Sequence, residues 1–137
     1  MSIKVNWQQN LEFVATTEQG HRIQLDANSD VAPCPTEVLL SALGSCSATD
    51  VVMGLQEAAV GLQSLTNDIT YTLTKPATDN EPQLYKTVNL HFTVTADNVG
   101  KEQVAQIVEQ AISRYCHVCL MLQPSMEISF SVDVTST

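Results

Sequence analysis

Apolar and polar residues alternate in three short stretches near the start of the chain, which is the period of a β-strand with one buried face. These stretches are residues 3–7, 11–15 and 23–25, and a turn-like segment, Gln19-Gly20-His21-Arg22, precedes the third. The pattern predicts an N-terminal antiparallel meander. Residues 26–35 collect Asp, Asn, Ser and two prolines, and we expect them to form a loop.

The pattern changes at Pro35, where good helix formers and small residues begin and continue to Val60. This segment predicts a long helix. Apolar residues fall on nearly all of its faces, which is typical of a buried helix. Small residues flank Cys46, so other parts of the chain can approach the helix closely at that point.

The second half of the chain returns to strand-like patterns. Residues 68–75 and 84–95 predict two strands joined by a polar loop, 76–82, and residues 126–134 predict a closing strand. Between them, after Asp97-Asn98, apolar residues recur at spacings of three and four up to the pair Gln123-Pro124. That spacing predicts a second, amphipathic helix. Its apolar face consists of Val104, Ile107, Val108, Ala111, Ile112 and Tyr115.

The predicted order of elements is therefore βββ-α-ββ-α-β. A chain of 137 residues without internal repeats has room for one domain, here residues 1–137. We expect an α+β fold in which a mostly antiparallel sheet packs against a long buried central helix and a second amphipathic helix.

Charge narrows the choice of partners. The chain has 15 acidic and 6 basic residues, a net charge of −9, and no basic cluster, which disfavours nucleic acid and membrane partners. The first ten residues lack the apolar run of a signal peptide, and from the sequence we expect a cytoplasmic protein without a transmembrane segment. The charged fraction of 15% is low, which favours a surface buried against another subunit.

Four cysteines in a chain without a secretion signal indicate redox chemistry, metal binding or simple burial rather than structural disulfides. Cys46 lies about ten residues into its helix, beyond the helix dipole, and its neighbours one turn away, Asp50 included, supply no cation that would activate it. From the residues alone, a core cysteine is the more ordinary interpretation. We interpret Cys34, between two prolines, as an incidental surface thiol.

Cys116 and Cys119 form a CxxC pair with His117 between them. The pair could bind a metal, form a redox dithiol or simply pack in the core. Zinc would need four ligands, with Cys34 or Cys46 added, and there is no second CxxC to supply them. A thioredoxin-type CxxC begins a helix after a strand, whereas this one follows a helical pattern. We expect no metal and no other cofactor.

Two segments resemble the cysteine motifs of the OsmC/Ohr family, and of its YhfA-like branch most of all. They are PCPTEVLLSALGSCSATDVV, around Cys46, and SRYCHVCLML, around Cys116; GHRIQLDAN and ISFSVDV also fit. The resemblance implies an intertwined homodimer with active sites at the subunit interface. It also implies reduction of organic hydroperoxides in oxidative or osmotic stress defence, with Cys46 attacking the peroxide and Cys116 resolving the product.

The chain departs from the family pattern at several positions. His117 stands where proline is common, and Cys119 is an additional thiol. The family's peroxidases hold the attacking thiolate with an arginine and a glutamate, for which Arg22 and Glu37 are the matching residues. Glu37 precedes Cys46 by nine residues, two and a half helical turns or about 13.5 Å, so the two cannot meet within one subunit. Glu37 would then act through an irregular helix start or in the partner's site.

Two functional hypotheses follow. In the first, Cys46 and Cys116 reduce a small organic hydroperoxide and a cellular dithiol restores both thiols. In the second, the protein is a catalytically weak or inactive dimer that binds a small apolar ligand.

Overall fold

The structure is a computed structural model that describes residues 1–75 and 80–137. Part of the predicted loop 76–82 therefore lies outside the described residues. By contacts the chain divides into two compact units, Met1–Ser41 and Ala42–Thr137. The length of the chain predicted one domain over residues 1–137, and that organisation stays a prediction.

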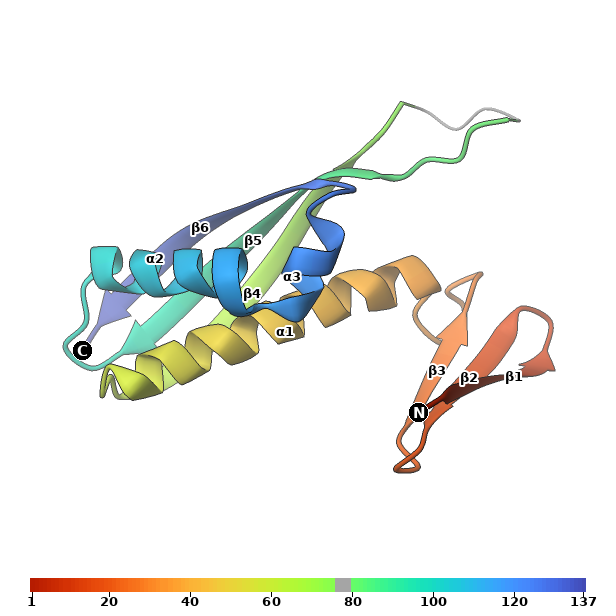
Figure 1. Ribbon diagram of the computed structural model, residues 1–137, viewed down its shortest axis with the longest axis horizontal. Helices are drawn as coiled ribbons and strands as arrows, with labels where there is room; N and C mark the ends of the chain where they lie inside the picture. Colours follow the sequence, from red (N-terminus) through yellow and green to blue (C-terminus); the bar gives the residue numbers. More distant parts are fainter. Residues whose placement is uncertain (76–79) are drawn as a thin grey trace. The chain divides into compact units, whose positions relative to one another are not determined.

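The first unit contains a three-stranded sheet, in the order β1 (Ile3–Gln9), β2 (Glu12–Thr17) and β3 (Arg22–Asp26). Both pairings are antiparallel, which confirms the predicted meander (Figure 1). The register gives the sheet an apolar face and a polar face. The apolar face is built by cross-strand neighbours, namely Val5, Ala15 and Ile23 in one row and Trp7, Phe13 and Leu25 in the next.

The loop after β3 is organised by Asp26. Its carboxylate accepts hydrogen bonds from the backbone N–H groups of Asn28, Asp30 and Val31 at 2.9, 3.1 and 3.1 Å. These bonds, that from Asn28 foremost, hold the pKa of Asp26 below its ordinary value although burial acts in the opposite direction. The predicted loop is thus a defined structure that leads into the long helix.

The second unit contains another three-stranded sheet, in the order β4 (Leu62–Leu73), β5 (Tyr85–Ala96) and β6 (Glu127–Ser136). β4 and β5 are antiparallel, and β4 begins at Leu62, six residues before the predicted start. β5 and β6 are parallel because a helical crossover joins them. The fold is α+β as predicted, and three of the four strand pairings in the described part of the chain are antiparallel.

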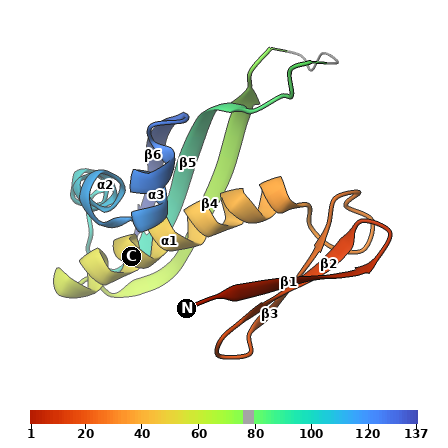
Figure 2. The ribbon, with the colours of Figure 1, turned by 45° about the vertical axis from the view of Figure 1, so that its right-hand side comes forward.

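The long helix α1 spans Pro35–Glu57, close to the predicted bounds. Its burial is one-sided rather than all round: Leu43, Val51 and Leu55 are fully buried, whereas Leu39 and Met53 are 38% and 52% exposed. Figures 1 and 2 show α1 on the same side of the second sheet as the later helices. The Asn67 side chain of β4 donates a hydrogen bond to the Gly44 carbonyl at 3.1 Å, which ties the helix to the sheet.

The predicted second helix is not continuous. It consists of α2 (Lys101–Gln110), a π-helical turn η1 (Ala111–Tyr115) and α3 (His117–Leu122), with Cys116 in an extended conformation between the last two. The prediction of one continuous helix was therefore wrong for this segment. Because the π turn adds a residue to the repeat, Tyr115 turns outward and is 55% exposed, although the spacing placed it on the apolar face.

Within the described residues, α1 alone has the length and apolar composition of a membrane-crossing helix. The core helix of a soluble protein has the same properties, so this finding is weak support for a membrane segment.

Candidate functional site

Three side chains of the second unit meet where α1 passes the start of α3. The sulfur atoms of Cys46 and Cys116 and a carboxylate oxygen of Asp50 all lie within 4.8 Å of one another. Cys46 and Asp50 are half-buried, and Cys116 is fully buried. The structure thus brings together the two cysteines that the family resemblance paired, although they are seventy residues apart in the sequence.

Close packing of α1 sets the position of Cys46. A Cβ atom on Gly44 would collide with Ile69 Cδ1 of β4, so glycine allows the helix to approach the sheet here. Ser47, also buried, keeps its hydroxyl within the helix by donating to the Leu43 carbonyl at 2.8 Å. The small residues that flank Cys46 in the sequence therefore serve this close approach.

The π turn sets the position of Cys116. Its N–H group donates to the Ala111 carbonyl, five residues earlier, at 2.7 Å, after which the backbone becomes extended with φ −69° and ψ 106°. Cys116 then caps α3, because its sulfur accepts a hydrogen bond from the N–H group of Cys119 at 3.2 Å. A continuous helix would lack this cap and would direct residue 116 differently.

The surroundings of the two buried thiols favour their protonated forms. Burial raises the pKa of Cys116, and the neighbouring Cys46 raises it further, although hydrogen bonds from Cys119 act in the opposite direction. Burial also raises the pKa of Cys119, as do the nearby Cys116, Cys46 and Asp50. Within the described chain, the groups that act on these thiols are other thiols and a carboxylate, and no activating cation is among them.

Glu37, the predicted glutamate, lies at the start of α1 in the first unit. One of its carboxylate oxygens accepts hydrogen bonds from the Ser29 hydroxyl at 2.9 Å and from the Cys34 N–H group at 3.0 Å. These bonds, that from the Cys34 backbone foremost, lower the pKa of Glu37. A glutamate in the third helical position that binds the N-cap backbone in this way stabilises the helix start.

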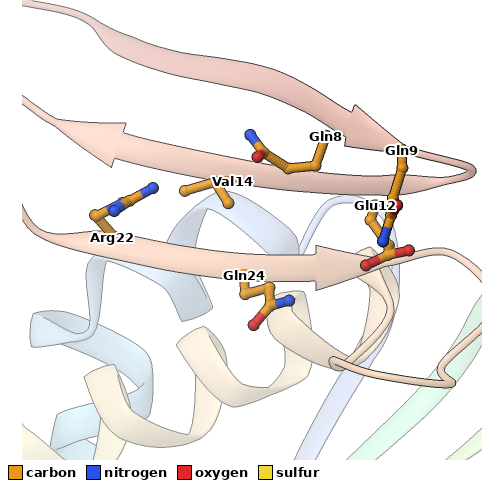
Figure 3. A pocket seen from close by; sticks show the side chains of 6 residues that line it. All are labelled: Gln8, Gln9, Glu12, Val14, Arg22 and Gln24. Carbon is orange, nitrogen blue, oxygen red and sulfur yellow. The ribbon is translucent and has the colours of Figure 1, made fainter.

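Arg22, the predicted arginine, also belongs to the first unit. It is exposed on the polar face of the first sheet, where it lines a pocket of about 510 Å³ with Gln8, Gln9, Glu12, Val14 and Gln24 (Figure 3). The part of the chain that the structure describes contains no ion pair to Arg22. Its guanidinium group therefore remains available to an anion.

Cys34 and His117 are the remaining two residues that the sequence singled out. Cys34 is half-buried, and its sulfur lies 3.2 Å from the Thr36 hydroxyl. His117 is exposed, so its side chain does not lie between the two buried thiols that flank it in the sequence.

Sequence reasoning did not assign a role to Asp50. The spacing could have indicated that Asp50 lies beside Cys46, because Asp50 follows Cys46 by four residues and side chains at that spacing share one helix face. Its proximity to Cys116 depends on the interruption of the second helix, which the sequence pattern did not reveal.

The family model for OsmC-like protein matches residues 27–131. The chain belongs to the OsmC-like family. It is 38% identical to Protein YhfA of Escherichia coli (strain K12) over 137 residues, covering 99% of each chain.

Solved structures share the family fold. An OsmC-like protein from Mycoplasma pneumoniae superimposes with a TM-score of 0.82 at 19% identity, covering 98% of this chain and 96% of that one. A protein from Legionella pneumophila, described as the organic hydroperoxide resistance protein OsmC, superimposes with a TM-score of 0.72 at 14% identity, covering 97% of each. At these identities the likeness shows the fold alone. The α+β architecture of this chain is thus that of OsmC-like proteins.

Proposed function

We propose that this protein is a cysteine-based peroxidase that reduces organic hydroperoxides in the cytoplasm as part of stress defence. The observation that carries the proposal is the proximity of the Cys46 and Cys116 sulfur atoms, within 4.8 Å of each other. Family membership and likeness to a described organic hydroperoxide resistance protein support a stress-related redox role.

The cycle has three steps. The Cys46 thiol loses its proton, the thiolate attacks the terminal oxygen of the hydroperoxide, and the O–O bond breaks. The leaving alkoxide takes up one proton and departs as an alcohol, with Cys46 oxidised to a sulfenic acid. The Cys116 sulfur then attacks the Cys46 sulfur, water leaves and a disulfide forms. A cellular dithiol reduces this disulfide by thiol exchange and becomes oxidised in turn.

The active form in this proposal is a homodimer. All seven residues of β1 are exposed within one chain, and Trp7 is 65% exposed beside its apolar neighbours on the sheet. An apolar sheet face of this kind is typical of a surface that another chain covers. In the dimer, Arg22 of a second copy supplies the cation that the Cys46 thiolate needs, and Glu37 holds the start of α1.

A second hypothesis has a specific observation in its favour. The Asp50 carboxylate lies beside both sulfur atoms and disfavours additional negative charge there. This favours a weakly reactive OsmC-like dimer whose apolar surfaces bind a small apolar ligand. Nucleic acid and membrane partners are not part of either proposal, in line with the net charge of −9.

Peroxide consumption by the reduced protein separates the two hypotheses. With cumene hydroperoxide and a dithiol reductant, we expect turnover by the wild type and, as the family resemblance implies, faster turnover than with hydrogen peroxide. Cys46→Ser should abolish turnover, whereas the matched control Cys34→Ser should leave it unchanged. If wild-type Cys46 remains a thiol after one equivalent of peroxide, the ligand-binding hypothesis replaces the peroxidase.

A further inference from the structure

The cluster of Cys46, Asp50 and Cys116 has the composition of a metal site. Two sulfur atoms and a carboxylate oxygen converge within 4.8 Å, all in the second unit of the chain. Cys46 and Asp50 project from one face of α1, and Cys116 comes from the cap of α3. The three ligands are therefore held by two separate elements rather than by one mobile loop.

We propose that these three side chains bind one Zn²⁺ ion through both sulfur atoms and one Asp50 carboxylate oxygen, with the fourth position open. Zinc in proteins is tetrahedral and accepts both thiolate and carboxylate ligands. With Zn–S bonds of about 2.3 Å, two sulfurs in a tetrahedral site are about 3.8 Å apart. The two sulfur atoms, which lie within 4.8 Å of each other, thus need to approach by about 1 Å at most.

The donor set selects zinc over other common ions. Ca²⁺ and Mg²⁺ require shells of oxygen ligands, which two thiols do not provide. Cu⁺ prefers thiolate and thioether ligands, and the carboxylate would contribute little to it. A mixed pair of thiolates with a carboxylate matches the borderline softness of Zn²⁺.

The reaction balances in charge and protons. One Zn²⁺ ion binds two thiols and one carboxylate, and two protons leave to solvent. The product carries a net charge of −1, whereas two thiolates beside a carboxylate without the ion would carry −3. The ion thereby supplies the positive charge that the described surroundings of these thiols lack.

Cys119 supports the site without being a ligand in it. Its N–H group donates to the Cys116 sulfur at 3.2 Å, and such bonds orient a metal-binding thiolate and stabilise its charge. Its own sulfur is fully buried and is not part of the cluster.

This inference goes beyond the proposed peroxidase and does not depend on it. Zinc binding is a property of the reduced thiols, whatever they do with a peroxide. If the protein also forms the Cys46–Cys116 disulfide, the zinc-bound and oxidised states exclude each other, because both use the same two sulfur atoms.

The test is a titration of the tag-free, reduced and metal-free protein with Co²⁺, followed by displacement with Zn²⁺. Tetrahedral cobalt with thiolate ligands gives intense visible bands and near-ultraviolet charge-transfer absorption. We expect these bands to saturate at one ion per chain and to disappear when Zn²⁺ is added. Absence of the bands in the wild type would overturn the proposal.

Variants then identify the ligands. Cys46→Ser and Cys116→Ser should each weaken binding by at least about 100-fold, since every ligand carries a large share of the binding free energy. Asp50→Asn should weaken it by about 10-fold, and the control Cys34→Ser should leave it unchanged. Bands that survive both cysteine substitutions, or that depend on Cys34, would contradict the assignment.

A measurement on the wild-type chain covers the case in which a variant fails to fold. Cys46 and Cys34 are both half-buried thiols, so they form a matched pair for alkylation by iodoacetamide. One equivalent of Zn²⁺ should slow alkylation of Cys46 at least about 10-fold while leaving Cys34 unaffected, because a zinc-bound thiolate is a poorer nucleophile. Equal rates at Cys46 with and without Zn²⁺ would refute the site.

Discussion

The N–H group of Cys119 donates a hydrogen bond to the Cys116 sulfur at 3.2 Å, so α3 begins at the cysteine that faces Cys46. This bond gives the two members of the CxxC pair different roles. The Cys116 sulfur belongs to the cluster with Cys46 and Asp50, whereas Cys119 supplies its backbone and keeps its own sulfur in the core.

This relationship predicts which disulfide forms. After one equivalent of cumene hydroperoxide, peptide mass mapping should find Cys46 bonded to Cys116, because their sulfur atoms are already close. Cys116→Ser should remove the disulfide, whereas Cys119→Ser should retain it. Cys34 should remain reduced. A Cys46–Cys119 disulfide in the wild type would show that Cys119, and not Cys116, is the resolving thiol.

The sequence was sufficient for the order of the strands, for the long helix and for the cysteine pair, but by different routes. Alternation predicted the six strands of the described chain, because that pattern follows from which face is buried, and a run of helix formers predicted the long helix. The pairing of Cys46 with Cys116 came from family resemblance. No local pattern relates two residues that are seventy positions apart, so spacing alone left Cys46 as a core residue.

What the sequence pattern missed lies around Cys116. The apolar spacing runs through Ala111 and Ile112 without interruption, so it gave no sign of the π turn. The turn is closed by the bond from the Cys116 N–H group to the Ala111 carbonyl, five residues earlier, which the apolar spacing does not distinguish from an α-helical bond. Since Asp50 meets Cys116 only after this break, its place in the site was hidden as well.

The contact between Gly54 of α1 and Ile107 of α2 predicts that the effect of Gly54→Ala on the free energy of unfolding depends on the side chain at position 107. A Cβ atom on Gly54 would lie 2.7 Å from Ile107 Cγ2, too close to be accommodated without movement. Gly54→Ala should therefore lower the free energy of unfolding by about 1–2 kcal/mol, despite the better helix propensity of alanine. In the Ile107→Ala background the same change should be neutral or stabilising, as measured by urea unfolding. An equal cost in both backgrounds would exclude this contact as the cause.

The cap formed by Glu37 predicts a dependence of stability on pH. Its pKa is lowered in the folded chain, so the contribution of its charge is present above the ordinary value of 4.5 and is lost as the pH falls through the folded pKa. Glu37→Gln should thus be less stable than the wild type at about pH 7, and this difference should be smaller at a pH well below 4.5.

Urea unfolding at the two pH values measures this difference. Glu57→Gln, at the last residue of α1, is the control: it should not lower stability at neutral pH, since a negative charge is unfavourable at a helix C-terminus. We also expect Glu37→Gln to slow peroxide reduction less than Cys46→Ser does. Complete loss of activity in a folded Glu37→Gln protein would mean that the carboxylate acts at the thiol itself.

The two faces of β1 predict a selective disruption of the proposed dimer. Light scattering should give about twice the chain mass of 14.9 kDa. Val5→Glu places a charge on the apolar face of the sheet and should yield a monomer. Asn6→Glu, the next residue on the opposite face, introduces the same charge and should leave the dimer intact. A wild-type protein that is monomeric at micromolar concentration would show that the proposed interface does not form.

The position of Asp50 predicts that one substitution accelerates the first step of the cycle. Its carboxylate lies within 4.8 Å of the Cys46 sulfur and opposes the negative charge of the attacking thiolate. Like charges about 4 Å apart in water repel by about 1 kcal/mol, roughly a five-fold effect on a rate. In a Cys116→Ser background, which isolates sulfenic acid formation, Asp50→Asn should therefore raise the rate of single-turnover peroxide consumption about five-fold.

The matched control for this rate is Glu57→Gln, which removes the same charge from the same helix seven residues farther on, about 10.5 Å along its axis. It should leave the rate unchanged, because an exposed charge at that distance is screened by solvent and salt. An equal acceleration by both substitutions would show a general effect of net charge. A slower reaction in Asp50→Asn would instead mean that the carboxylate accepts the Cys46 proton, so that the loss of a base outweighs the loss of repulsion.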